Sequence, residues 1–70
     1  MSFSINDFPK AAQFEYLKLV FKLDNAVYGS NPSEIEEIIE EIQQFASENI
    51  EDEELVENKV QAMKVKYLGF

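Results

Sequence analysis

Carboxylates are the chemically active groups that this 70-residue chain offers in quantity, with 14 Asp and Glu residues. Eleven of them lie between Glu34 and Glu57, a segment that contains no Lys or Arg. Within it Glu36 precedes Glu40, and Glu37 precedes Glu41, by four residues. On a helix such like-charged pairs repel, at a cost of about 0.2–0.5 kcal/mol each. The pattern therefore indicates a surface for a positively charged partner, or a charged face that keeps the protein in solution.

Enzymatic chemistry finds little support in the composition. The chain has no His and no Cys, and all six of its basic residues are Lys. Nucleophiles and general acids commonly depend on His, Cys, Arg or a metal, and carboxylates on an open helix face are well hydrated. A phosphate-binding loop is excluded because only Gly29 and Gly69 are present. We expect a protein that is not an enzyme.

A dedicated metal site would depend on the acids of residues 51–57. Calcium-binding loops bring several oxygens together around a Gly, as in D-x-D-x-D-G, and that pattern is missing here. We therefore expect no metal and no other cofactor.

The formal charge of −8 is unevenly distributed along the chain. Residues 34–57 carry −11 and the rest carries +3, which together give −8. Because nucleic-acid affinity comes largely from cations that meet phosphates, direct binding to nucleic acid or to an anionic membrane is not expected. No apolar run approaches ~20 residues, and the first residues lack the pattern of a signal peptide. These features predict a cytoplasmic protein.

The elements that carry these residues follow from the hydrophobic pattern. Residues 10–28 are apolar over most of a helical circumference, which predicts the hub of a small bundle or the seam of a dimer. The polar residues of this segment recur at helical steps, although residues 14–23 also alternate as a strand would. We prefer a helix over about residues 8–28, preceded by an extended arm at residues 1–6. Gly29 is predicted to end this helix in a left-handed conformation.

Two further helices are predicted, over about residues 32–47 and 51–67. Asn31, Pro32 and Glu34 give the first a capping-box-like start. Its buried stripe is Ile35, Ile38, Ile39, Ile42, Phe45 and Ala46. Asn49 is a candidate cap for the last helix, whose end, residues 60–67, has a strand as its alternative. Short loops imply antiparallel neighbours, so the prediction is one all-α domain spanning residues 1–70, an up-down-up three-helix bundle, with a homodimer as a further hypothesis.

The leading functional hypothesis is a non-enzymatic acidic module that modulates or inhibits a larger protein with a basic surface. At its sharpest, the carboxylates imitate DNA phosphates; small acidic phage proteins, antitoxins and immunity proteins have compositions of this general kind. The alternative is an accessory subunit that uses the apolar first helix and the C-terminal aromatics in a larger complex. Predicted contact residues are Glu36, Glu37, Glu40, Glu41, Gln44, Glu48, Phe21, Tyr67 and Phe70.

Overall fold

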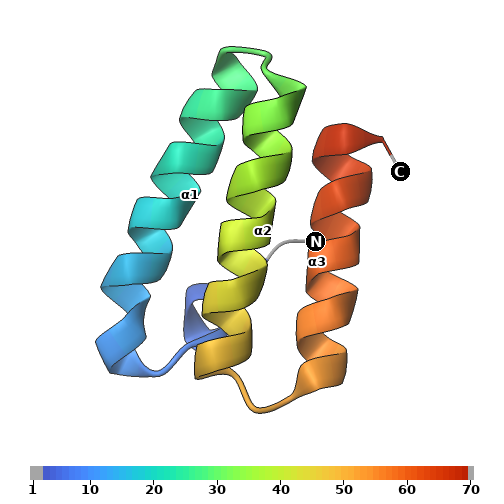
Figure 1. Ribbon diagram of the computed structural model, residues 1–70. Coiled ribbons are helices and arrows are strands. Elements are labelled where there is room, and N and C mark those ends of the chain that lie inside the picture. Colours follow the sequence, from blue (N-terminus) through green and yellow to red (C-terminus); the bar gives the residue numbers. More distant parts are fainter. Residues whose placement is uncertain (1–2, 70) are drawn as a thin grey trace.

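The computed structural model describes residues 3–69 and contains three α-helices that alternate in direction (Figure 1). They are α1 (Gln13–Tyr28), α2 (Pro32–Asn49) and α3 (Glu53–Leu68), preceded by the 3-10 turns η1 (Ile5–Asp7) and η2 (Lys10–Ala12). The predicted all-α three-helix bundle is confirmed. Within residues 3–69 there is no strand, so residues 14–23 and 60–67 are helical.

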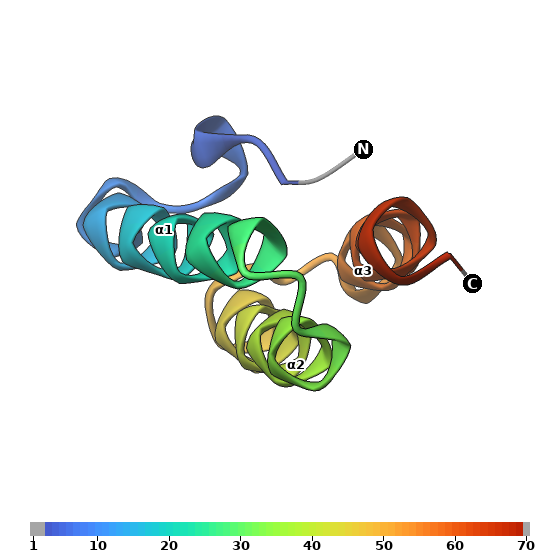
Figure 2. The same cartoon turned by 90° about the horizontal axis from the view of Figure 1, so that it is seen from above.

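The centre of the bundle is α2, and the prediction that residues 10–28 form its hub is wrong. α2 packs against both α1 and α3, whereas α1 and α3 are not paired along their lengths within the described chain (Figure 2). The physical reason lies in the isoleucines, which are spaced to bury one side of α2 against two neighbours. Ile39 and Ile42 are fully buried, whereas Phe14 and Phe21 of α1 are more than two-thirds exposed. The number of apolar residues in α1 did not reveal which of them face inward.

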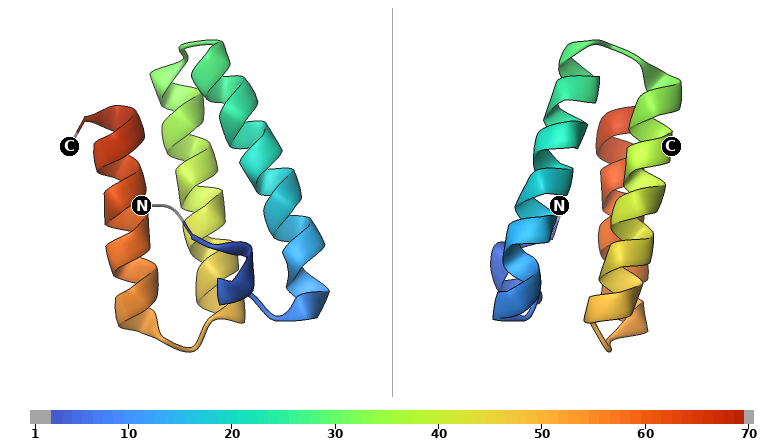
Figure 3. Two further views of the ribbon diagram at one scale, coloured as in Figure 1. Left: turned by 180° about the vertical axis from the view of Figure 1, so that it is seen from behind. Right: turned by 60° about the vertical axis from the view of Figure 1, so that its left-hand side comes forward.

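The N-terminal segment, residues 3–9, completes the core on the side of the bundle opposite to α2 (Figures 2 and 3). Phe3 and Phe8 are buried, and the Tyr16 hydroxyl donates a hydrogen bond of 2.8 Å to the Phe3 carbonyl. The Phe8 ring stacks on Tyr16 with 4.5 Å between centroids and lies 5.4 Å from the Phe45 ring. Residues 3–6 therefore differ from the predicted extended arm, because Phe3 packs against Phe8 and against Tyr16 of α1, and the chain turns at η1.

The caps at the starts of α2 and α3 confirm one expectation from the sequence and correct another. Asn31 begins α2 as predicted, since its side chain accepts a hydrogen bond of 3.2 Å from the Glu34 amide. The cap of α3 is Asp52, whose carboxylate accepts from the Leu55 amide at 3.1 Å, and the prediction of Asn49 is wrong because that residue still belongs to α2.

The turn after α1 also differs from the prediction. Gly29 has φ −77°, an ordinary right-handed value, and Ser30 takes the left-handed conformation with φ 54°. The chain thus reverses one residue later than a glycine terminator would reverse it. At the end of α3, by contrast, a glycine does take the left-handed conformation, since Gly69 has φ 84°.

Candidate functional site: the acidic face of α2

Six of the predicted contact residues lie together on the outward face of α2. We call them the acidic band: Glu36, Glu37, Glu40, Glu41, Gln44 and Glu48. All six are exposed. Their position follows from the helical repeat of 3.6 residues, because the isoleucines take the opposite side of the same helix. The structure thus brings these predicted residues onto one surface.

One lysine forms an ion pair with the acidic band within the described residues. The Lys22 ammonium lies 3.0 Å from the Glu41 carboxylate, and both side chains are about half exposed. An ion pair of this kind contributes little to stability, since water and salt screen it. Within residues 3–69, the other acids of the 34–57 segment form no ion pair. The negative charge of the band is therefore presented to solvent almost undiminished.

A hollow of about 450 Å³ lies between α1 and α2 at the edge of the acidic band. Its wall consists of Lys22, Asn31, Ser33, Glu34, Glu37, Ile38 and Glu41. Three of these seven residues are carboxylates, and Lys22 is the cation among them. A lysine or arginine side chain from another molecule would find acceptors for its N–H groups at this place, with Ile38 beside its aliphatic stem.

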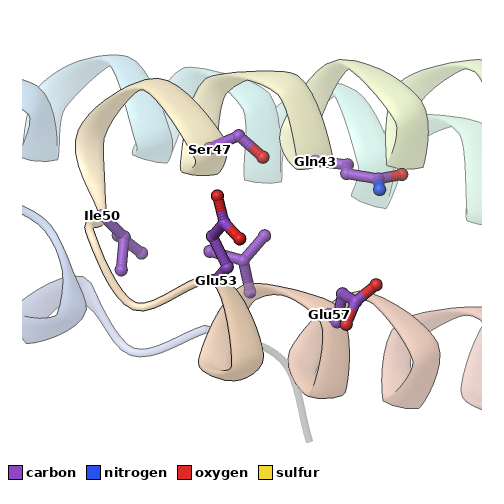
Figure 4. Close-up of a pocket in the computed structure, with 6 residues that line it drawn as sticks. Gln43, Ser47, Ile50, Glu53 and Glu57 are labelled. Carbon is purple, nitrogen blue, oxygen red and sulfur yellow. The ribbon is translucent and has the colours of Figure 1, made fainter.

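A second hollow, of about 270 Å³, separates α2 from the start of α3 (Figure 4). Gln43 and Ser47 of α2 line one side, Glu53 and Glu57 of α3 the other, and Ile50 closes the end. The wall offers amide, hydroxyl and carboxylate oxygens. Within residues 3–69, no group of three or more acids is placed so that it could hold a metal ion. The polar groups that line this second hollow can form hydrogen bonds, and their arrangement indicates no more specific chemistry.

The predicted aromatic contacts have three different outcomes. Phe21 is 71% exposed on the outer side of α1, so its ring is accessible, and its role as a contact stays a prediction. Tyr67 is half-buried and packs against the core, with the Lys66 ammonium 5.2 Å from its ring centroid. Phe70 lies outside the described residues. Phe14 and Tyr28, which are not among the predicted contacts, are 69% and 92% exposed. Their seven-residue spacing on either side of Phe21 was the available signal.

Tyr16 is an ionisable group whose surroundings change its chemistry. Burial, together with the smaller effects of the charges on Asp7 and Tyr67, raises its pKa from 10.0 to about 12. The phenol therefore stays protonated over a wide pH range and continues to donate to the Phe3 carbonyl. This interaction belongs to the fold and lies away from the acidic band.

Comparisons with protein-family models, with curated proteins and with solved structures find no match to this chain. Among the residues that the structure describes, no helix has the length and apolar character needed to cross a membrane.

Proposed function

We propose that this chain is a non-enzymatic, cytoplasmic protein-binding module that docks its acidic band onto the basic surface of a larger protein and modulates or inhibits that protein. The observation that carries the proposal is the exposed band itself, whose charge meets only Lys22 within the described structure. The other lysines lie in η2, in α1 and in α3, although the repulsion within α2 would be relieved by lysines on that helix.

Electrostatic complementarity would serve this function in two ways. Carboxylates gathered on one face steer a basic partner during encounter and set its orientation. At the edge of the band, the Lys22–Glu41 pair is exposed and weak, so an arginine of the partner could replace Lys22 at Glu41 with little loss. If the partner's basic surface normally holds nucleic acid, the band would occupy it in competition with phosphates.

The test compares two variants of equal charge. In the band variant Glu36, Glu37, Glu40 and Glu41 become Gln; in the control Glu51, Glu53, Glu54 and Glu57 become Gln. Each variant is used to capture partners from a cell lysate at about 50 mM and 500 mM salt. We expect the wild type and the control to retain the same partner at low salt, the band variant to lose it, and high salt to release it.

Two outcomes would contradict the proposal. Equal losses from both variants would mean that total charge, and not this face, governs capture. If the band variant captures the partner as the wild type does, and salt does not release it, then the contact is not electrostatic. Both variants would first be compared with the wild type by circular dichroism. Removing like charges within α2 is expected to leave that helix intact or to strengthen it, whereas Glu53 and Glu54 of the control lie in the first turn of α3, where their charge is favourable with the helix dipole.

A second candidate function, an accessory subunit in a larger complex, is favoured by the exposed aromatics of α1. Phe21 would then be a contact in that complex, since aromatic side chains are common at the energetic centres of interfaces. This function predicts that the band variant binds normally and that Phe21→Ala loses the complex. Phe70→Ala gives the corresponding test of the C-terminal aromatic.

A further inference from the structure

A row of apolar side chains runs along the outer face of α1, directly opposite the face that joins the core. Phe14, Phe21 and Tyr28 follow one another at intervals of seven residues, and Leu17 lies between the first two. Their exposed fractions are 69%, 71% and 92% for the rings and 44% for Leu17. Among residues 3–69, no other helix lies beyond α1 on the side away from α2 and α3 (Figures 2 and 3). We call these four residues the aromatic stripe.

The stripe is large for the surface of so small a protein. A Phe or Tyr side chain covers about 150–250 Å² when buried, so the three exposed rings present roughly 450 Å². Soluble monomers rarely expose continuous apolar patches beyond a few hundred Å². Two stripes facing each other would bury roughly 900 Å² from the rings alone. With Leu17 and the rims, such a contact approaches the ~1,200–2,000 Å² of a standard protein interface.

The charge distribution favours a second copy of this chain as the occupant. Two copies of this chain, each with a net charge of −8, repel each other, and the repulsion is strongest where their 34–57 segments come close together. α1 is different, because Glu15 and Asp24 are balanced by Lys18 and Lys22. Contact through α1 therefore places the electrically balanced helices against each other and leaves both acidic bands on other helices, exposed to solvent.

The stripe also has the pattern that self-association requires. An interface with two-fold symmetry is formed by the same surface on both copies, so that surface must complement itself. Phe14 and Tyr28 lie at equal distances on either side of Phe21, so a copy rotated about an axis at Phe21 aligns ring with ring. Apolar residues at seven-residue intervals match one of the two positions of a coiled-coil seam, and the other position is Leu17 in the first heptad and Asp24 in the second.

From these observations we propose that the chain forms a homodimer through the aromatic stripe, with the two α1 helices antiparallel and Phe21 near the two-fold axis. The antiparallel arrangement is chosen because it sets the helix dipoles in opposite directions. It brings Phe14 of one copy close to Tyr28 of the other. The contact is separate from the acidic band, which stays free for a basic partner.

Sedimentation equilibrium of the whole chain, from micromolar to about millimolar concentration, tests the proposal. We expect the mass of the wild type to rise from 8.1 kDa towards twice that value. Phe21→Lys should stay at 8.1 kDa over the same range. Val65→Lys is the matched control, because it makes the same charge change at an apolar residue of α3 that is 55% exposed, and it should dimerise as the wild type does. A monomeric wild type, or equal loss in both variants, would overturn the proposal.

Crosslinking tests the arrangement, since the chain has no natural cysteine. On mild oxidation we expect Phe21→Cys to form a disulfide dimer and Tyr28→Cys to form little. A mixture of the Phe14→Cys and Tyr28→Cys chains should give the mixed disulfide, which mass spectrometry identifies. Efficient linkage of Tyr28→Cys to itself, with no mixed disulfide, would contradict the antiparallel arrangement.

Salt separates this proposal from the function proposed for the acidic band. Dimerisation through α1 should be unchanged or strengthened by salt, because screening reduces the repulsion between two chains of −8. Capture of a basic partner by the band should be weakened by salt. Because the two effects have opposite signs, either proposal can fail while the other holds.

Discussion

Replacement of Phe8 by Ala tests whether the N-terminal segment is part of the core. Phe8 is 3% exposed and its ring contacts the rings of Phe3, Tyr16 and Phe45 at 5.5, 4.5 and 5.4 Å between centroids. Truncation of a buried Phe to Ala costs about 3–5 kcal/mol through lost transfer energy and the cavity that remains. A domain of 70 residues has a stability of roughly 4–10 kcal/mol. The substitution is therefore expected to remove about half of the stability.

Urea unfolding followed by circular dichroism at 222 nm measures this loss, and thermal unfolding should show a fall in Tm of at least about 12 °C. Phe14→Ala is the matched control, because it removes the same atoms from a side chain that is 69% exposed. At micromolar concentration, where a dimer through α1 would be dissociated, the control should change stability by no more than about 0.5 kcal/mol. A loss below about 1 kcal/mol for Phe8→Ala would refute the reasoning and would mean that residues 3–9 do not form part of the core in solution.

Three further predictions concern single side chains. The pKa of Tyr16 is 10.0 in the unfolded chain and about 12 in the folded protein. The stability that this difference contributes to the folded state is therefore fully present below pH 10 and is lost as the pH rises towards 12. Urea titrations should show that the free energy of unfolding falls by roughly 2–3 kcal/mol over that pH range. The Tyr16→Phe variant should lack this part of the fall. Ser30→Gly should stabilise the protein by about 0.5–1 kcal/mol, measured as a higher urea midpoint, because φ 54° is strained for Ser. Asp52→Ala should cost about 1 kcal/mol in the same assay and Asp52→Asn much less, since Asn also caps helices; equal losses would contradict the capping role.

Helical periodicity predicted the helices because it depends on near neighbours in the chain. The isoleucine stripe of α2 and the cap at Asn31 are local patterns, and both are present in the structure. The acidic band follows from the same periodicity, since a helix with one buried side has a determined outer side. The centre of the bundle could not be predicted in this way, because it depends on contacts between elements. α1 has more bulky apolar groups than α2, yet Phe14 and Phe21 are exposed.

The role of residues 3–8 was also beyond local reasoning. Phe3 and Phe8 follow no helical repeat, and their burial results from contacts with Tyr16 and Phe45, which are distant in the chain. The conformation of the turn after α1 could not be predicted from the sequence either. A glycine permits a left-handed conformation without requiring one, so composition alone could not decide between Gly29 and Ser30.

The central position of α2 has a consequence for how the chain reaches this structure. Each of its two large contacts joins helices that are consecutive in sequence, α1 with α2 and α2 with α3. Short chain segments therefore have to close, which is typical of domains that fold within microseconds to milliseconds. Residues 3–8 can dock only against a surface that α1 and α2 have already formed. We expect them to be the last part of the core to assemble and the first to open, a sequence of events that amide hydrogen exchange would resolve.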